Sequence, residues 1–432
     1  MPGDEFCSHL SLILASLCRG QSLIENLSPS KDCRITLGAL KKLGISIQVE
    51  SNRANVQGKG LNGLVVPKEA IDFADSKMSF YLLAGIFSGQ EKESRLRGDS
   101  YLLDGFRRNL APSLEKMGVE VTFSKRSPVV SLENKGLKSL SFHPNQEDPL
   151  ARASLELASL FVEGYTNFIQ SENEDQIGEK LLRLFGADLD VVSDHVQNSS
   201  EVIDFRKKRK PKDQKGSFRL TIQGKKDLNP QNINLPRDAL LAIFFAALAI
   251  FTKKSQVELE GVDAEGSHFK VLQLLKNMGA EILLKKTESG NLSTARIIPS
   301  SSETKGRKID LSQLDQVLPM LAVIAALSQQ TTIIRGLSKS RQGKTNKLKI
   351  VSDNLRKMGA KLGELGDGLV IEGRGILNGA QLDGKGDFSI SLGLLLASLL
   401  AEEESELEGY QKVLDFYPNL FELLNSVCEH YK

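Results

Sequence analysis

A unit made of an apolar helix, a strand, a second helix and a closing glycine recurs along the chain, and this repeat constrains the fold most. Its clearest copy begins with residues 239–251, which are apolar on every side and predict a helix buried all round. Asp238 stands where that helix needs a capping oxygen. The second helix of this copy ends at Gly279, and a glycine there predicts a C-terminal cap with positive φ. The apolar run is shorter than the roughly 20 residues that span a bilayer.

The same unit is expected six times. Its first helices are expected at residues 10–17, 78–87, 151–161, 239–251, 317–327 and 390–400. Five of the second helices end in an apolar residue followed by glycine, with a strand-like run after it; these glycines are Gly44, Gly118, Gly186, Gly279 and Gly359. The sixth second helix, at residues 419–427, has no strand after it. A period of about 70 residues is longer than that of common solenoids and predicts a globular βαβαββ unit. Five copies of one ending make chance recurrence the weaker explanation.

Two similar turns divide the repeats into halves. Pro2-Gly3-Asp4 precedes the first unit, and Leu235-Pro236-Arg237-Asp238 precedes the fourth. A chain of 432 residues is long enough for two or three domains. We therefore predict an α/β (α+β) protein of two domains, with three units in residues 5–234 and three in residues 235–432.

Composition narrows the class of protein. Of the residues, 40% are apolar and 25% are charged, which is ordinary for a globular chain. The net charge of +2 provides no general attraction to nucleic acid or to membranes. Acidic residues ahead of the first apolar run argue against a signal peptide. The cysteines have no metal or redox spacing and predict reduced thiols in a cytoplasmic protein; they are Cys7, Cys18, Cys33 and Cys428.

Familiar catalytic motifs are absent from the sequence. The five histidines are scattered, and none falls in a metal-binding spacing. No nucleophile elbow or catalytic-cysteine signature is present. We therefore expect no metal and no cofactor, and we expect a monomer that makes no contact with a membrane.

Two basic segments invite a functional interpretation. Residues 206–215 read RKKRKPKDQK, but no aromatic residues interleave with the charges, so we predict an exposed loop without a nucleic-acid role. Gly343-Lys344-Thr345 lies between an expected strand and an expected helix, as in a phosphate-binding loop. The first glycine of that motif is missing, because its position is Ser338. Nearby cations at a helix start either hold an anion or form an exposed basic face.

The motifs of the repeat resemble those of the enolpyruvyl transferase family, and of its 5-enolpyruvylshikimate-3-phosphate synthases in particular. Pro2-Gly3-Asp4 with Ser8-His9 is similar to the family's first hinge, and residues 235–238 are similar to its second. Further matches stand at Gly98-Asp99, Leu318-Pro319, Gly386-Asp387 and Tyr417-Pro418. The resemblance covers nearly the whole chain and implies a two-domain inside-out α/β barrel of six βαβαββ units.

The family resemblance implies an activity that this chain is poorly equipped to perform. The family joins phosphoenolpyruvate to the 5-hydroxyl of shikimate 3-phosphate and releases phosphate, so its site needs several cations. Here Glu5 and Phe6 replace a lysine and a serine, and Leu10 replaces an arginine. Residues 74–81 replace the segment that holds phosphoenolpyruvate, and residues 148–150 replace the one that contacts the shikimate phosphate.

Few candidate site residues remain. The family's catalytic aspartate position is Gln316 here, and Asp315 is one residue out of register, so a one-residue bulge would restore it. Ser8 at the first hinge is a candidate for substrate binding. An anionic small molecule is the expected partner of three cations that recur every three residues, namely Arg341, Lys344 and Lys347.

These departures favour one functional hypothesis over two others. Loss of several charged contacts costs on the order of 10 kcal/mol, which removes most of an enzyme's rate advantage. The favoured hypothesis is a weakly active or non-catalytic member of the family. The alternatives are an active 3-phosphoshikimate 1-carboxyvinyltransferase of the shikimate pathway with relocated catalytic residues, and a nucleotide-binding protein acting through residues 343–345. The family usually has a strand before the first hinge. We expect that this chain either lacks that strand or was assigned a start codon that lies after it.

Overall fold

The computed structural model describes residues 1–142, 148–171, 177–193, 217–264, 266–289, 292–312, 314–338 and 346–428. The chain divides into two compact units. The N-terminal unit comprises Phe6–Glu25 and Asp32–Asn234, and the C-terminal unit comprises Met1–Glu5, Asn26–Lys31 and Leu235–Lys432. The segment Asn26–Lys31, which the sequence prediction placed in the first domain, therefore groups with the C-terminal unit. Across the described residues, every helix is too short or too polar to traverse a bilayer.

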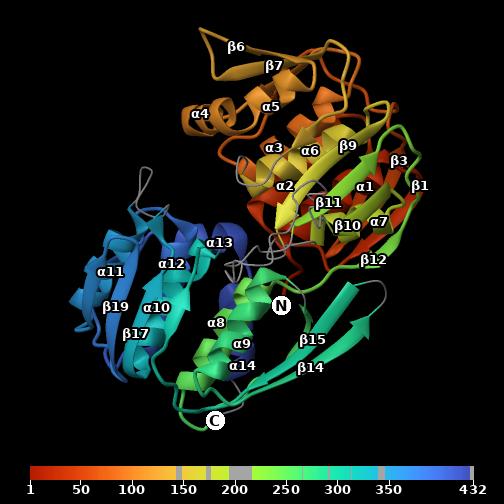
Figure 1. The fold of residues 1–432 in the computed structure, drawn as a ribbon. Coiled ribbons are helices and arrows are strands. Elements are labelled where there is room, and N and C mark those ends of the chain that lie inside the picture. The colour runs from red at the N-terminus through yellow and green to blue at the C-terminus, as the bar shows by residue number, and fades with distance from the viewer. Residues whose placement is uncertain are drawn as a thin grey trace, which may run out of the picture. The chain divides into compact units, whose positions relative to one another are not determined.

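The N-terminal unit alternates helices with short strands (Figure 1). Its helices are α1 (Glu5–Leu17), α2 (Lys31–Lys42), α3 (Lys77–Ser88), α4 (Ser100–Asn109), α5 (Ala111–Lys116), α6 (Pro149–Ser159) and α7 (Ile177–Leu184). Its strands are β1 (Arg19–Glu25), β2 (Ser46–Glu50), β3 (Arg53–Lys59), β4 (Ile71–Asp72), β5 (Ser94–Arg97), β6 (Val119–Phe123), β7 (Val129–Asn134), β8 (Ser141–Phe142), β9 (Tyr165–Ser171), β10 (Asp188–Ser193), β11 (Ser217–Gln223) and β12 (Asn232–Asn234).

The C-terminal unit is built in the same way. Its helices are α8 (Ala239–Phe251), α9 (Ser267–Asn277), the 3-10 turn η1 (Asp315–Val317), α10 (Leu318–Leu327), α11 (Lys347–Lys357), α12 (Phe388–Leu400), α13 (Gln411–Phe416) and α14 (Leu420–Cys428). Its strands are β13 (Leu259–Asp263), β14 (Ile282–Ser289), β15 (Leu292–Pro299), β16 (Lys308–Asp310), β17 (Gln329–Arg335), β18 (Lys361–Leu365), β19 (Gly368–Arg374), β20 (Gln381–Asp383) and β21 (Glu406–Glu408).

The sheets repeat one pairing scheme, which confirms the predicted βαβαββ unit. Among the described residues the N-terminal unit has three four-stranded sheets, ordered β12-β1-β3-β2, β4-β5-β7-β6 and β10-β11-β9-β8. In each of them one parallel pair is followed by two antiparallel pairs. The sheet β16-β17-β19-β18 of the C-terminal unit follows the same scheme. Two smaller sheets, β13-β15-β14 and β20-β21, complete that unit.

Glycines end the second helices because the chain turns there with positive φ. The φ angles of the five predicted glycines are 82° at Gly44, 97° at Gly118, 84° at Gly186, 105° at Gly279 and 84° at Gly359. An L-residue with a side chain rarely adopts this conformation, so the glycine lets the chain leave the helix and begin the next strand. The C-terminal cap predicted at Gly279 is confirmed.

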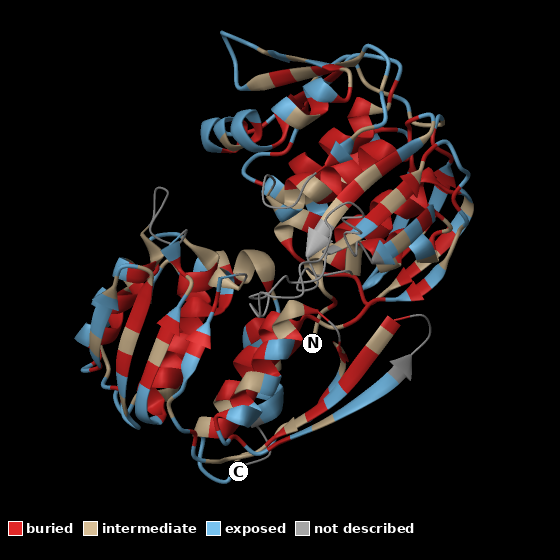
Figure 2. Cartoon of the chain, viewed as in Figure 1, coloured by how far each residue is buried: buried red, intermediate tan, exposed pale blue. Residues whose placement is uncertain are grey.

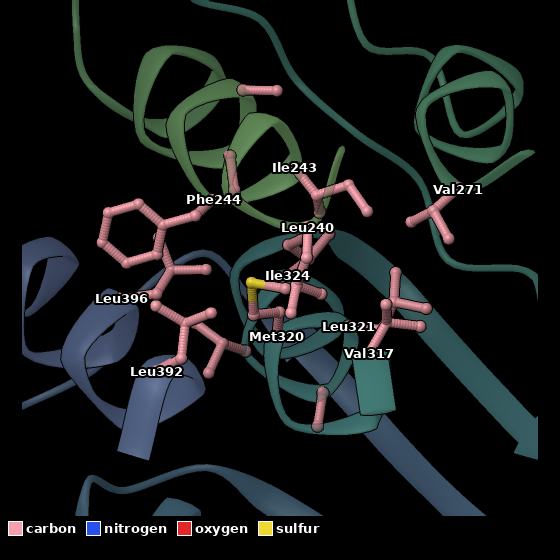
Figure 3. Close-up of a cluster of buried hydrophobic side chains, with 14 of the residues drawn as sticks. Leu240, Ile243, Phe244, Val271, Val317, Met320, Leu321, Ile324, Leu392 and Leu396 are labelled. Carbon is pink, nitrogen blue, oxygen red and sulfur yellow. The ribbon is translucent and has the colours of Figure 1, made fainter. Parts of the chain in front are cut away.

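The apolar first helices form the cores of the two units (Figure 2). Helix α8 spans Ala239–Phe251 as predicted, and Asp238 caps it by accepting a hydrogen bond from the Leu241 amide at 2.8 Å. Figure 3 shows side chains of α8 gathered with those of α10 and α12; these include Leu240, Ile243, Phe244, Met320, Ile324 and Leu392. A helix with no polar face is stable only when other helices surround it, which α10 and α12 do here.

The cap of α8 is also tied to the C-terminal end of its unit. Burial raises the pKa of Asp238, and the hydroxyl of Tyr417 donates a hydrogen bond to that carboxyl group. We expect Tyr417→Phe to lower the free energy of unfolding by about 1–3 kcal/mol, because it leaves a buried acceptor short of one partner. Chemical denaturation measures this, with Tyr410→Phe as the control, since Tyr410 is 37% exposed. Equal stability of the two variants would contradict the prediction.

Candidate functional site

Helix α1 carries the first group of sequence-predicted positions. Ser8 is fully buried, and Leu10, which stands where the family resemblance implies an arginine, is only 2% exposed. Both side chains therefore lie in the interior of the N-terminal unit. The substrate-binding role of Ser8 stays a prediction, but the apolar side chain of Leu10 offers no hydrogen bond to an anion.

The start of α3 lies against the start of α6 in the same unit. Lys77, the first residue of α3, places its Nζ 2.6 Å from Oδ2 of Asp148. The same Nζ lies 5.1 Å from the ring centroid of Tyr81, within reach of a cation–π interaction. Burial, followed by the charge of Asp148, raises the pKa of the Tyr81 hydroxyl. Lys77 lies in the segment that replaces the family's phosphoenolpyruvate-binding segment. Its charge is thus paired with a carboxylate of the same unit.

Asp148 has a second role at the first turn of α6. It is the N-cap residue of that helix, and its Oδ1 accepts a hydrogen bond from the Leu150 amide at 2.9 Å. The first amides of a helix attract anions because they lack partners within the helix. The carboxylate of Asp148 therefore lies where a bound phosphate or carboxylate would otherwise be stabilised.

One turn further along α6, a buried ion cluster surrounds Arg152. Its Nε lies 2.8 Å from Oε1 of Glu156, and its Nη2 lies 3.3 Å from Oε1 of Glu179 on α7. The exposed fractions of the three side chains are 16%, 7% and 9%. The guanidinium group is thus shared between two carboxylates of the fold. Sequence reasoning missed this cluster, although the spacing of four residues between Arg152 and Glu156 was a readable signal.

In the C-terminal unit, Asp315 begins the 3-10 turn η1, which leads into α10. Its side chain is half-buried, whereas that of Gln316 is exposed. The 3-10 turn places the two residues on different sides of the chain just before α10. The catalytic role of Asp315 stays a prediction.

Lys347, the first residue of α11, is held by the start of α12. Its Nζ donates a hydrogen bond to Oγ of Ser389 at 3.0 Å and lies 3.4 Å from Oδ2 of Asp387. Ser389 in turn donates to Oδ1 of Asp387 at 2.7 Å, and Asp387 caps α12 through the Ile390 amide at 3.1 Å. Arg341 and Lys344, predicted to bind an anion with Lys347, lie outside the described residues. So do residues 343–345 and the basic segment 206–215.

Aspartate side chains cap the N-termini of several helices in both units. Besides Asp148 and Asp387, Asp238 caps α8, and Asp99 caps α4 through the Leu102 amide at 2.6 Å. Each carboxylate is stabilised by the positive end of its helix dipole. Four helix N-termini that would attract an anionic ligand thus already carry the side chain of an aspartate, an acid like the ligand.

The architecture and the motif positions define the class to which the chain belongs. Repeated βαβαββ units in two compact bodies are the fold of enolpyruvyl transferases. Within that class the chain belongs to the EPSP synthase (3-phosphoshikimate 1-carboxyvinyltransferase) family, whose model matches residues 1–202 and 210–424.

Known relatives match the chain over its full length. The 3-phosphoshikimate 1-carboxyvinyltransferase of Persephonella marina is 29% identical over 437 residues, covering 100% of this chain and 96% of the relative. The protein of that name from Streptococcus sanguinis is 27% identical over 435 residues. The structure of EPSP synthase from Acinetobacter baumannii superposes with a TM-score of 0.82 at 25% identity, covering 99% of this chain and 94% of that one. The enolpyruvyl transferase NikO from Streptomyces tendae, at a TM-score of 0.73 and 16% identity, shares the fold.

Proposed function

We propose that this chain keeps the EPSP synthase fold but transfers enolpyruvyl from phosphoenolpyruvate to shikimate 3-phosphate far more slowly than its relatives, or not at all. The observation that carries the proposal is the ion pair between Lys77 and Asp148 at the start of α6. In this contact a lysine that could bind an anion is paired with a carboxylate that also caps the helix.

The ion pair opposes anion binding in two ways. A phosphate at the start of α6 would approach the carboxylate of Asp148, and like charges a few ångströms apart repel each other. Lys77 would also have to leave Asp148 before it could bind the phosphate, so the gain from the new contact is offset by the loss of the old one. The buried cluster of Arg152 with Glu156 and Glu179 likewise commits a cation of α6 to the fold.

The C-terminal unit presents the same arrangement at Lys347. Its Nζ is held by Asp387 and Ser389, so an anion recruited by this lysine competes with a carboxylate. We propose that binding of a small anion by Arg341, Lys344 and Lys347 is weak for this reason. Phosphate or sulfate binding that is undiminished in a Lys344→Ala, Lys347→Ala double variant would exclude a role for these lysines.

An active 3-phosphoshikimate 1-carboxyvinyltransferase is the second candidate function. Full-length similarity to proteins of that name favours it, since relatives from two organisms align with at least 99% of the chain. An active transferase requires that residues outside the family's motif positions supply the cations and the acid–base group. Asp315 is the candidate for that group.

A direct comparison of turnover separates the two candidates. Phosphate release from phosphoenolpyruvate and shikimate 3-phosphate is measured for this protein and for the Persephonella marina relative under the same conditions. We expect a kcat/KM lower by at least about 10³-fold, because several charged contacts are missing at once. Turnover comparable with that of the relative would overturn the proposal and establish the second candidate.

Removal of the blocking carboxylate provides a complementary prediction. In Asp148→Ser the serine still caps α6, while Lys77 loses its partner and becomes available to an anion. We expect the variant to bind inorganic phosphate at least about tenfold more tightly than the unaltered protein, a difference of about 1.4 kcal/mol. Calorimetric titration measures this, and Asp99→Ser is the control because it removes the cap carboxylate of α4. If the two variants bind phosphate equally, the Lys77–Asp148 pair does not exclude the ligand.

A further inference from the structure

Strand β14 forms a free edge of the sheet β13-β15-β14 in the C-terminal unit (Figure 1). Strand β15 pairs with one side of β14 in antiparallel register, and the described residues contribute no strand to its other side. Leu283 lies on this edge and is 60% exposed, more than any other large apolar side chain in the described part of the chain. A free edge that carries an exposed apolar side chain is a surface on which a further strand can pair.

The hydrogen bonds around β14 show which backbone groups face the free edge. The carbonyl oxygen of Glu281, the residue before β14, accepts a hydrogen bond from the Ser300 amide at 2.9 Å, so the backbone groups of residue 281 face β15. Alternate residues of a strand direct their N–H and C=O groups to opposite sides. Leu283 therefore also faces β15 with its backbone groups, whereas Ile282 and Leu284 present theirs to the free edge.

We propose that this edge pairs with the same edge of a second copy of the chain, antiparallel and about a two-fold axis at Leu283. Leu283 then lies opposite Leu283 of the second copy, and Ile282 lies opposite Leu284. Because Ile282 and Leu284 both direct their backbone groups across the junction, each such pair exchanges its N–H···O bonds. A contact made by the same surface on both copies closes at two chains and does not continue into a fibre.

The charges on β14 fit this register. The side chains of Glu281, Leu283 and Lys285 lie on one face of the strand, because side chains alternate between the faces. Both charged side chains are exposed, and neither forms an ion pair within the described residues. With Leu283 on the axis, Glu281 of each copy lies opposite Lys285 of the other, and opposite charges directly across a strand pair are stabilising. A shift of one residue in each copy would place Leu283 opposite a charged side chain and remove both charge pairs.

Apolar side chains form a row across the same junction. Ile298 on β15 lies opposite Leu283 and is half-buried. Pairing of two copies therefore places Ile298 and Leu283 of one copy beside Leu283 and Ile298 of the other, and apolar cross-strand neighbours stabilise a sheet. A single strand pair is smaller than a standard interface of roughly 1,600 Å², so the association is weak. The monomer expected from the sequence is then the form present at low concentration.

Association is tested on the full-length protein by sedimentation equilibrium over about 5–500 µM, a range that detects weak dissociation constants. We expect the average mass to rise from that of one chain toward that of two. Leu283→Lys should weaken dimerisation by more than about tenfold, because it places like charges opposite each other on the axis. Val65→Lys is the control, since Val65 is 57% exposed and belongs to the N-terminal unit. The mass of one chain at the highest concentration, or equal dimerisation of the two variants, would overturn the proposal.

Exchange of the two charges tests the register. Lys285→Glu places a glutamate opposite Glu281 of the second copy, so dimerisation should weaken at least about threefold, as expected when a cross-strand ion pair becomes a repulsive one. Glu281→Lys combined with Lys285→Glu restores opposite charges and should return the dissociation constant to that of the unaltered protein. A double variant that dimerises no better than Lys285→Glu would refute this register.

A disulfide across the axis provides an independent test. Residues that face each other without exchanging hydrogen bonds have Cα atoms about 4.5 Å apart, within the range of a disulfide. Leu283→Cys should therefore form a cross-linked dimer under mild oxidation. In the control Lys285→Cys, the two cysteines lie about 13 Å apart along the strands and should not cross-link. Both variants retain the buried Cys7, Cys18 and Cys33, and the unaltered protein gives the background. Equal cross-linking of the two variants would exclude the proposed axis.

Discussion

Replacement of Gly393 by valine is expected to destabilise the C-terminal unit by about 3 kcal/mol, since overpacked cores cost about 1–3 kcal/mol and sometimes more. Gly393 lies in the middle of α12, where that helix crosses the first turn of α10. A Cβ atom added there would lie 2.4 Å from Cβ of Pro319 and 2.8 Å from its backbone carbon. The second of these atoms belongs to the backbone and cannot rotate away, so the two helices would have to separate.

The N-terminal unit offers a counterpart, and α2 offers a control. A Cβ atom at Gly85 on α3 would lie 2.0 Å from the backbone oxygen of Ser154 on α6, so Gly85→Val should have a similar cost. Gly38 on α2 has no atom within 4 Å of an added Cβ, and Gly38→Ala should stabilise the protein by about 0.5–1 kcal/mol. Denaturation monitored separately for the two units measures these effects. Equal midpoints for Gly393→Val and Gly38→Ala would show that α10 and α12 separate without cost.

Features set by neighbouring residues could be predicted from the sequence. The extent of α8 and its cap at Asp238 follow from an uninterrupted apolar run preceded by a capping residue. The positive φ of Gly279 follows from its place between a helix and a strand. Repetition of this pattern was sufficient to predict the βαβαββ unit, whereas the family was predicted from the resemblance of motifs such as Pro2-Gly3-Asp4. These signals are local, and the chain carries them several times.

Features that depend on pairing through space could not be predicted. Lys77 and Asp148 are 71 residues apart, and no periodicity links them. The segment Asn26–Lys31 groups with the C-terminal unit although its neighbours on both sides belong to the other one. Nδ1 of His9 on α1 and Oγ1 of Thr36 on α2 likewise meet only through space, because the two residues are 27 positions apart.

Arg152→Met is expected to lower the free energy of unfolding by about 3–5 kcal/mol, because it removes the cation from between two buried carboxylates. Methionine keeps most of the side-chain volume, so the loss is electrostatic rather than a cavity. Glu156 and Glu179 would remain 7% and 9% exposed, with no guanidinium group to balance them. Lys135→Met is the control: that lysine is 51% exposed and its pair with Glu133 lies at the surface, so we expect a change within about 0.5 kcal/mol.

A compensating variant separates the loss of attraction from the penalty of an unbalanced charge. If buried charge without a partner is the cause, Arg152→Met combined with Glu156→Gln and Glu179→Gln should recover at least half of the lost stability, because the amides are neutral and nearly isosteric. Chemical denaturation of the single and triple variants measures the recovery. A triple variant that is no more stable than Arg152→Met would mean that Arg152 stabilises α6 through packing, for example against Phe168, whose ring centroid lies 5.8 Å from the guanidinium carbon. In that case the two glutamates would tolerate burial without it, and the cluster would not explain why this cation is withheld from a ligand.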